Sequence, residues 1–205
     1  ALVQLKLEGP YFKRIAGVKF VGTTEIIHKH RSLAKDRGDI LFTEYGVSGP
    51  PIFQISRKAG ELLTAGEEGY LKVTIIDTFS KEELTKVMEK RFQLGPKKPV
   101  DFSLVGLINK RLIPVVLMEA GLHDLKCPVA ELTREERARI VEILTDWRFK
   151  IRGTMSWANA QVTAGGVDTR EIEEETMESK LVKGLFFAGE IMDIDGQCGG
   201  FNLQW

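Results

Sequence analysis

The stretch K-G-L-F-F-A-G-E-I-M-D-I-D-G-Q-C-G-G-F-N-L-Q-W, residues 183–205, decides how the rest of this chain is interpreted. Its apolar run at residues 185–188 is bounded by glycines, a pattern typical of a buried strand, and of a parallel one in particular. Glycines directly after such a strand let the backbone approach a ligand closely. An acid at a strand's carboxyl end commonly holds sugar hydroxyls. Spacing alone leaves two interpretations open: a ligand loop at the end of a buried strand, or a glycine-rich surface turn.

The composition is that of a globular protein without a charge bias. The 205 residues include 29 Lys+Arg and 29 Asp+Glu, and 43% of them are hydrophobic, enough to bury a sizeable core. A nucleic-acid binder usually carries a basic surplus, so no nucleic-acid partner is expected. Cys127 and Cys198 lie far apart in the sequence, which favours a reduced, cytoplasmic protein. No apolar run approaches the roughly 20 residues of a membrane span, so no membrane association is predicted.

Strand patterns dominate residues 1–76. These segments alternate apolar and polar side chains or are rich in β-branched and aromatic residues. Ser48 is placed to cap a helix that has Pro50 and Pro51 in its first turn and runs to about residue 65. Short strands at this spacing predict a small antiparallel β-barrel or sandwich. The predicted strands are residues 2–8, one or two within 15–27, 39–43 after a turn at 36–38, and 71–76.

Helical patterns take over in residues 77–147. Four predicted helices with short connections indicate a helical subdomain. Residues 148–155 return to strand alternation, so the subdomain is inserted between strands of the barrel. The helices are predicted to begin at Ser80 and Thr133, which form capping boxes with Glu83 and Glu136, at residue 103, and at Pro114, where Gly121 ends the helix.

Three stretches of this sequence resemble one known family, in the same order. The stretch G-L-F-F-A-G-E-x-x-D-x-D-G-x-x-G-G-F-N-L-Q-W closely resembles the C-terminal flavin-binding signature of the BaiN-like (YhiN-like) family of NAD(P)/FAD-dependent oxidoreductases. Residues 159–167, N-A-Q-V-T-A-G-G-V, and residues 41–50, L-F-T-E-Y-G-V-S-G-P, are also similar to that family. The resemblance covers nearly the whole chain and favours the ligand-loop interpretation of residues 183–205.

The resemblance implies a flavin site built from two segments of the chain. Glu190 takes the position where such flavoproteins place an acid near the ribityl or pyrophosphate hydroxyls. Residues 199–202 take the position of a loop whose backbone N–H groups face the isoalloxazine edge. Residues 163–166 fall on the flavin side, near the substrate, although an isolated T-A-G-G turn is more often a hairpin. The cofactor-binding residues predicted in this way are Thr163, Gly165, Gly166, Gly189, Glu190, Asp193, Gly199, Gly200, Phe201 and Asn202.

One anchor of a complete FAD site is missing from the sequence. A G-x-G-x-x-G turn holds the pyrophosphate at a helix N-terminus, yet no two of the 20 glycines are two positions apart. In the resembled family this turn lies upstream, in a Rossmann-type half, so we expect that half to be the partner of this chain within a longer protein. The expected class is α+β. The expected parts are a barrel (1–76 and 148–155), a helical subdomain (77–147) and a segment returning to the FAD domain (156–205).

Other reactive side chains have simpler explanations. His28 and His30 are predicted on one strand face, too few for a zinc site, and no metal is predicted. Cys198 precedes the double glycine but lacks a C-x-x-C partner. Ser48 has no histidine and aspartate that would mark a catalytic triad. No catalytic acid or base is assigned from the sequence.

The predicted function is FAD-mediated hydride transfer between NAD(P)H and a small organic substrate, carried out by the intact protein. The resemblance leaves the substrate open, because members are associated with reduction of steroid-like enones and with amine oxidation. Two alternatives stay open: a binding or interaction domain without catalysis, and part of a flavin-dependent RNA-modifying enzyme. The neutral charge argues against the second. The choice between NADH and NADPH and the oligomeric state, including a homodimer, are also open.

Overall fold

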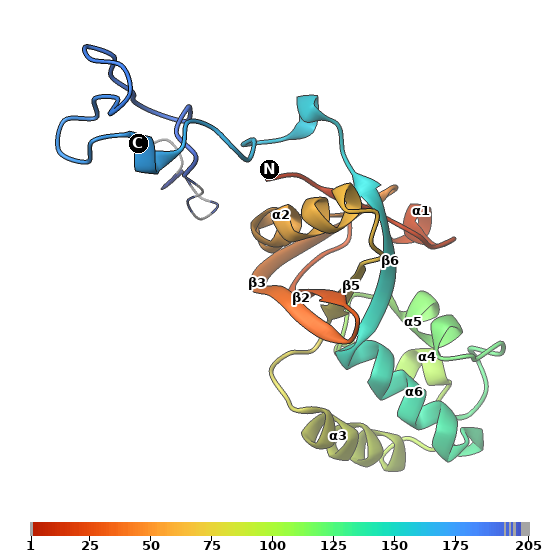
Figure 1. Cartoon of the computed structure of the whole chain (residues 1–205). Coiled ribbons are helices and arrows are strands. Elements are labelled where there is room, and N and C mark those ends of the chain that lie inside the picture. Colours follow the sequence, from red (N-terminus) through yellow and green to blue (C-terminus); the bar gives the residue numbers. More distant parts are fainter. Residues whose placement is uncertain (1, 195, 197, 199, 202–205) are drawn as a thin grey trace.

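A computed structural model describes residues 2–194, 196, 198, 200 and 201. Within this part of the chain, strands pair antiparallel in the order β1–β4–β3–β2–β5–β6, and β6 pairs again with β1, so that the sheet closes into a ring (Figure 1). The α+β class and the antiparallel sheet are therefore confirmed. The strands are β1 (Leu5–Leu7), β2 (Lys19–His28), β3 (Arg31–Thr43), β4 (Gly46–Ser48), β5 (Tyr70–Thr74) and β6 (Trp147–Thr154).

The two longest strands, β2 and β3, form a hairpin with a two-residue turn. Lys29 and His30 occupy that turn in the left-handed region, with φ of +46° and +66°, as the tight turns that suit twisted hairpins require. The predicted turn at residues 36–38 is wrong, because the β2 ladder continues through these residues. Their polar side chains lie on a strand with one solvated face, which mimics a turn in the sequence. His30 therefore does not share a strand face with His28.

Aromatic side chains fill the interior of the ring. Phe42, Trp147 and Phe149 are buried, and the ring centroids of Trp147 and Phe149 are 4.7 Å apart. Phe12, from the short helix α1 (Phe12–Ile15), packs against Phe149 at 5.5 Å. Because side chains occupy the interior, as in other small closed sheets, the surfaces open to ligands lie outside the ring.

Helix α2 (Pro50–Thr64) packs against β3 on the outside of the ring (Figure 1). Its first turn contains the predicted prolines, but its N-cap is Gly49 and not Ser48, which pairs with Leu41 in β4. A Cβ atom at Gly49 would lie 2.1 Å from the carbonyl oxygen of Asp39. The position therefore requires glycine for close backbone approach, and the prediction of a Ser48 cap is wrong.

The remaining α-helices lie at one end of the ring, between β5 and β6 in sequence (Figure 1). Both predicted capping boxes, at Ser80 and Thr133, are present. The predicted helix at residues 103–112 is wrong, since Gly106 has a φ of +81° and interrupts helical geometry. No helix in the described part of the chain has the length and apolar character needed to cross a bilayer. The helices are α3 (Lys81–Gln93), α4 (Val100–Ser103), α5 (Ile113–Glu119) and α6 (Arg134–Thr145).

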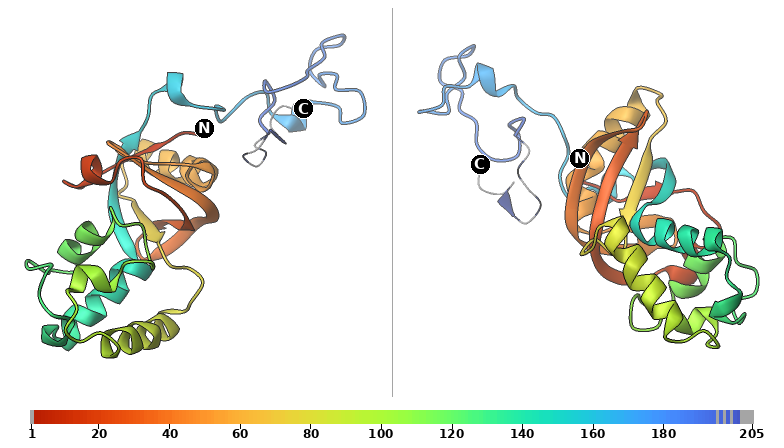
Figure 2. Two further views of the ribbon diagram at one scale, coloured as in Figure 1. Left: turned by 180° about the vertical axis from the view of Figure 1, so that it is seen from behind. Right: turned by 90° about the horizontal axis from the view of Figure 1, so that it is seen from below.

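The chain from residue 156 to residue 194 leaves the ring on the side away from α3–α6 (Figure 2). Its regular structure consists of the 3-10 turns Trp157–Asn159 and Thr169–Glu171 and isolated bridges. Residues 185–188, predicted as a buried strand of a parallel sheet, form no strand in this chain: Phe186 is 59% exposed and makes a single bridge, to Glu178. Because the prediction places this strand beside strands of a Rossmann-type half, it stays a prediction for the intact protein. A buried strand needs neighbours that complete its ladder, and the described residues of this segment provide none. Residues 163–166 are not the turn of a hairpin, the structure that an isolated T-A-G-G turn more often forms: Val162 bridges to Leu2, and Ile172 to Ser179.

Candidate functional site

Residues 161–167 join the predicted ligand segments to the ring. The N–H of Leu2 donates to the carbonyl of Val162, and the N–H of Gln161 donates to the carbonyl of Leu2, both at 2.8 Å. Leu2 leads directly into β1. These two hydrogen bonds hold the start of the C-terminal segment beside the first strand.

The same segment brings together two of the predicted ligand-binding stretches. The N–H of Val167 donates to the carbonyl of Ile191 at 2.8 Å, and the N–H of Asp193 donates to the carbonyl of Val167 at 3.0 Å. The resulting Val167–Met192 bridge is parallel. Residues 163–166 and 189–193, separated in sequence, therefore lie side by side.

The positions of these stretches that are occupied by glycine differ in what surrounds them. A Cβ atom at Gly166 would lie 2.4 Å from the carbonyl oxygen of Ile191, so this glycine is needed where two backbones meet. Gly165 and Gly200 have φ of +94° and +97°, and a Cβ atom at either would meet nothing within 4 Å. Gly189 also has a positive φ, +83°. The structure thus leaves room beside Gly165 and Gly200, whereas the close approach of the Ile191 backbone accounts for the glycine at position 166.

The polar side chains predicted for the site are exposed to solvent. Thr163, Glu190 and Asp193 are all exposed, and among the hydrogen bonds and ion pairs of the described residues none uses their side-chain oxygens. Carboxylates in this state can accept hydrogen bonds from ligand hydroxyls without first breaking an internal pair.

A pocket of 620 Å³ lies between α2 and the start of the C-terminal segment. Helix α2 contributes Gly60 and the charged residues Arg57 and Glu61 to its lining, and Thr154 lines it from the end of β6. Trp157, 78% exposed, lines one side, and Ala164 with Gly165 lines another. The predicted T-A-G-G turn is therefore part of a concave, largely apolar site, the kind that binds small organic molecules.

The C-terminal loop reaches the N-terminal half of α2. The N–H of Cys198 donates to Oε1 of Gln54 at 3.0 Å, and the Cys198 thiol lies 3.8 Å from Oε1 of Gln161. Gly200 and Phe201 of the predicted loop are exposed, whereas Gly199 and Asn202 lie outside the described residues. Sequence reasoning missed Gln54 and Trp157. Nothing in the local pattern marks either one, since their roles depend on contacts across the fold.

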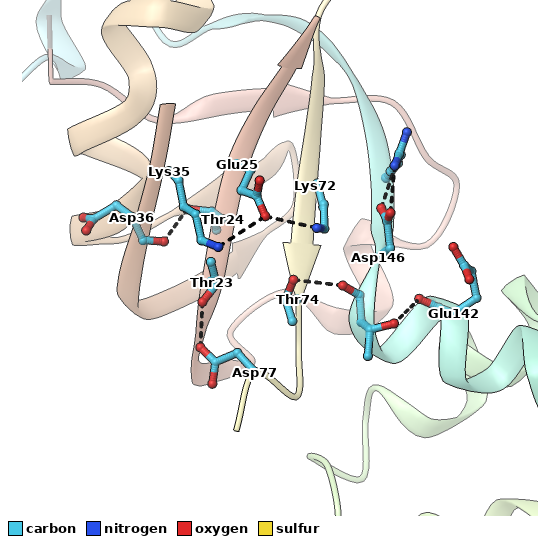
Figure 3. Close-up of polar contacts among 12 residues, drawn as sticks. Thr23, Thr24, Glu25, Lys35, Asp36, Lys72, Thr74, Asp77, Glu142 and Asp146 are labelled. Carbon is cyan, nitrogen blue, oxygen red and sulfur yellow. Dashed lines mark hydrogen bonds and ion pairs between the residues drawn. The ribbon is translucent and has the colours of Figure 1, made fainter. Parts of the chain in front are cut away.

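A separate group of charged residues lies on the outer face of β2 and β5, near the helical end (Figure 3). Oε1 of Glu25 lies 3.0 Å from Nζ of Lys72 and 3.8 Å from Nζ of Lys35. Burial alone raises the pKa of Glu25, but the hydrogen bond and charge of Lys72, followed by Ser32 and the charge of Lys35, outweigh it and hold that pKa below its ordinary value. Because these charges are matched within the group, we assign it a structural role.

Metal binding and thiol chemistry find little support in the geometry. Among the described residues, no three His, Cys, Asp or Glu side chains are placed to hold one metal ion. Nδ1 of His28 lies 2.7 Å from the carbonyl oxygen of Glu68. Burial, followed by the charge of Asp124, raises the pKa of Cys127, which keeps that thiol protonated and weakly reactive.

Comparison with known proteins identifies the family. Residues 1–162 match the family described as the HI0933-like protein barrel and H2TH domain. The chain belongs to this family. It is 34% identical over 205 residues to a 3-dehydro-bile acid delta(4,6)-reductase from Clostridium scindens, covering 100% of the chain and 50% of that relative. It is also 30% identical over 206 residues to a ribosomal RNA dihydrouridine synthase from Escherichia coli, covering 100% of the chain and 48% of that relative.

A ribosomal RNA dihydrouridine synthase from Haemophilus influenzae is 32% identical over 169 residues, covering 81% of the chain and 39% of that relative. The chain spans about half, or less, of the length of these relatives. The resemblance to the BaiN-like family is confirmed. The HI0933-like match ends at residue 162, within the segment that joins the ring to the candidate site. The similarity to the reductase continues through the residues beyond it.

Proposed function

We propose that this chain is part of a flavin-dependent reductase whose intact form transfers hydride from NAD(P)H to a small organic substrate. The reducible bond would be a carbon–carbon double bond conjugated to a carbonyl group. Three relatives, which carry two different names, support this chemistry. One is named a delta(4,6)-reductase of a 3-dehydro-bile acid and the others dihydrouridine synthases. Both names describe adding two hydrogens to a ring that also carries a carbonyl.

The observation that carries the proposal is the pairing of residues 163–167 with residues 189–193 beside the 620 Å³ pocket. The first stretch lines the pocket. The second presents Glu190, whose carboxylate is uncommitted among the described residues. Residues 189–193 would hold the flavin through Glu190 and Asp193, and their pairing with residues 163–167 would join the cofactor-binding stretch to the lining of the substrate pocket.

The residues present fit one half of an FAD site. Open space beside Gly165 and Gly200 leaves the backbone accessible, and Glu190 and Asp193 are exposed acceptors for ribityl or ribose hydroxyls. When bound, FAD supplies hydride transfer to and from its ring, while the protein supplies binding and orientation. The phosphate anchor would come from a Rossmann-type half, which we propose as the partner of this chain in the intact protein.

Each part of the chain would have a distinct task in such an enzyme. Glu190 would accept hydrogen bonds from the cofactor's hydroxyls, and the pocket between α2 and Trp157 would hold the apolar body of the substrate. Closing that pocket around a flat substrate would exclude water from the reacting carbon. In this arrangement the ring (1–76 and 148–155) and the helical part (77–147) support residues 156–205. The protein would work in the cytoplasm, where NAD(P)H is available.

The test compares this chain with a longer protein that includes the proposed flavin half. The longer protein is expected to be yellow, to lose its flavin absorbance with NADH or NADPH under anaerobic conditions, and to regain it on adding a steroid enone. This chain alone is expected to be colourless, because phosphate anchoring is a major part of dinucleotide binding. A longer protein that binds no flavin would refute the proposal. A yellow chain of 205 residues would show that the division of the site is wrong.

Trp157→Ala in the longer protein tests the pocket. With the side of the pocket removed, KM for the enone is expected to rise about tenfold, the loss expected for much of an aromatic contact. The reduction of the flavin by NAD(P)H is expected to be unchanged, since that step does not use the pocket. An unchanged KM would place the substrate elsewhere.

A second candidate function is modification of RNA, favoured because two of the relatives are named ribosomal RNA dihydrouridine synthases. The reaction class would be the same, with uridine within RNA as the substrate. Reoxidation of the reduced flavin by RNA, and not by a steroid enone, would select this candidate.

A further inference from the structure

A small pocket with a basic rim lies on the helical end of the molecule, away from the candidate site. It measures 280 Å³ and has an apolar wall formed by Pro99, Val105 and Pro114. Phe102 of α4 stands beside it and is 53% exposed. Nζ of Lys98 lies 5.4 Å from the centre of the Phe102 ring. An exposed aromatic ring and a cation, which attract each other, therefore stand side by side at the edge of this pocket.

Cationic side chains line this pocket, and others lie next to its lining residues. Lys110 and Lys126 line it, and the only acid lining it is Asp101, which pairs with Lys126 at 2.6 Å. Next to Lys110, Nη2 of Arg111 donates to the carbonyl of Arg14 at 2.7 Å. That contact joins α1 to the helical end. The basic–aromatic surface consists of Arg14, Lys98, Phe102, Lys110, Arg111 and Lys126.

Most of these charges are not neutralised within the protein. Among the ion pairs of the described residues, none includes Arg14, Lys98, Lys110 or Arg111. The formal net charge of zero is an average over the whole chain and conceals this local excess. A neutral composition therefore does not exclude a phosphate-rich partner, and the earlier expectation of no nucleic-acid partner does not extend to this surface.

We propose that the basic–aromatic surface binds a single-stranded segment of RNA. A nucleobase would stack on Phe102 against the apolar wall of the pocket, and the flanking phosphates would contact Lys98, Lys110 and Arg111. Stacking on an aromatic side chain within a cationic groove is how single strands are held without sequence readout. The inference rests on the second candidate function, because we choose RNA as the ligand from the names of two relatives, which are ribosomal RNA dihydrouridine synthases.

Other anionic partners fit the surface less well. An acidic protein segment would use the cations but would have no need for a flat apolar wall beside an exposed ring. A membrane surface is bound through a broad apolar helix face, whereas this surface offers one exposed aromatic residue and a pocket. The combination of one ring, one pocket and a cationic rim matches the alternation of base and phosphate along a nucleic acid strand.

The test uses a fluorescein-labelled, 12-nucleotide uridine RNA and fluorescence anisotropy across a range of salt concentrations. The variant K98E/K110E/K126E is expected to bind at least about tenfold more weakly, with a salt slope lower by at least about 1.4, since Lys98 and Lys110 each contact a phosphate and each such contact on a single strand contributes about 0.7. The matched control, K6E/K180E/K183E, changes three lysines that are exposed and changes the net charge equally. It is expected to lose far less affinity.

Phe102→Ala separates stacking from charge. Its affinity is expected to fall about 5- to 100-fold, the range for loss of one base–aromatic stack, while the salt slope stays unchanged. Phe102 is largely exposed, so the fold should tolerate the change, and circular dichroism checks this.

Several results would overturn the inference. These are no RNA affinity in the wild type, equal losses in the two triple variants, or equal binding of the same DNA sequence. Tight binding of polyglutamate or anionic vesicles that Phe102→Ala leaves unchanged would identify a different partner. The measurement needs neither flavin nor turnover. A protein that binds RNA through this surface but holds no flavin would refute the reductase proposal alone.

Discussion

Glu190 is the side chain through which the proposed flavin site is most directly tested. Its carboxylate is exposed and uncommitted among the described residues, beside the Val167–Met192 bridge. In the intact protein, Glu190→Ala is expected to weaken FAD binding about ten- to hundredfold, because hydrogen bonds to a charged acceptor are worth about 1.5–3 kcal/mol. The FAD affinity of Glu190→Asp is expected to lie between those of the wild type and Glu190→Ala, since the charge remains but the side chain is shorter. Flavin fluorescence titration of apoprotein measures the affinities.

The Glu190 variants need a folding control, which circular dichroism provides. An exposed carboxylate contributes little to a core, so the alanine variant should fold normally. If the folded alanine variant binds FAD as tightly as the wild type, Glu190 lies outside the cofactor site.

Asp77 links stability to pH at the junction between the ring and the helical end (Figure 3). It accepts hydrogen bonds from Thr23 at 2.7 Å and from Arg37 at 2.8 Å. Burial alone raises its pKa, but Arg37 and Thr23 outweigh it and hold the pKa below its ordinary value of 3.8. Asp77→Asn is expected to lower the free energy of unfolding by about 1 kcal/mol at pH 7, a modest figure because Arg37 is exposed.

The pH dependence of that difference follows from the lowered pKa. A carboxyl group whose pKa falls on folding stabilises the native state above its unfolded pKa and loses this effect as pH drops through its folded pKa. The gap between wild type and Asp77→Asn should therefore be constant above about pH 5 and should close as pH falls below 4. Urea unfolding at several pH values measures it. A gap that widened toward low pH would contradict the assignment.

At the scale of single elements, the capping boxes are the most secure local features. Ser80 Oγ accepts from the N–H of Glu83 at 3.2 Å, and the N–H of Ser80 donates to the Glu83 carboxylate at 2.8 Å. Ser80→Ala is expected to cost about 1 kcal/mol, lowering Tm by about 2–4 °C for a chain of this size. Ser80→Asp retains a capping acceptor and should stay close to the wild type. Thermal unfolding followed by circular dichroism compares them. Equal losses in both variants would mean that the cap contributes nothing.

Elements with strong local determinants could be predicted from the sequence, and others could not. The capping boxes, the prolines of α2 and the alternation in β5 each depend on contacts within a few residues. The turn expected at residues 36–38 failed because β3 pairs with β2 through those residues. The same limit applies to the glycines of the candidate site. Gly165 and Gly166 cannot be told apart in the sequence. A Cβ atom at Gly165 would meet open space, whereas one at Gly166 would meet the backbone of Ile191, 25 residues away.

At the scale of the whole molecule, the sequence predicted the antiparallel sheet and its helical insertion but not the surfaces between distant segments. The pocket that Trp157 shares with α2, and the contact of Arg111 with Arg14, each join residues far apart in the chain. Periodicity carries no information on such contacts. The resemblance predicts where the ligand segments lie because it rests on motifs, and a motif can mark positions whose structural role depends on distant parts of the chain.

The stability of the chain should differ between the ring and the C-terminal segment. β2, β3 and β5 share continuous ladders, whereas residues 162–192 pair through isolated bridges and leave Leu185 and Phe186 exposed. Local opening costs little where few hydrogen bonds and buried contacts must break. Amides of residues 163–194 are therefore expected to exchange with solvent orders of magnitude faster than those of the three strands. Hydrogen exchange with mass spectrometry measures both regions at once.

The same measurement on the longer protein tests why residues 185–188 are apolar. If a Rossmann-type half supplies the neighbouring strands, these residues would gain a hydrogen-bonded ladder and their exchange should slow to match the ring. Their apolar side chains would then be buried as in other parallel sheets. Slow exchange of residues 185–188 in this chain alone would instead mean that these residues already have a partner. A molar mass twice the expected 23.0 kDa, measured by light scattering, would identify that partner as a second copy of the chain.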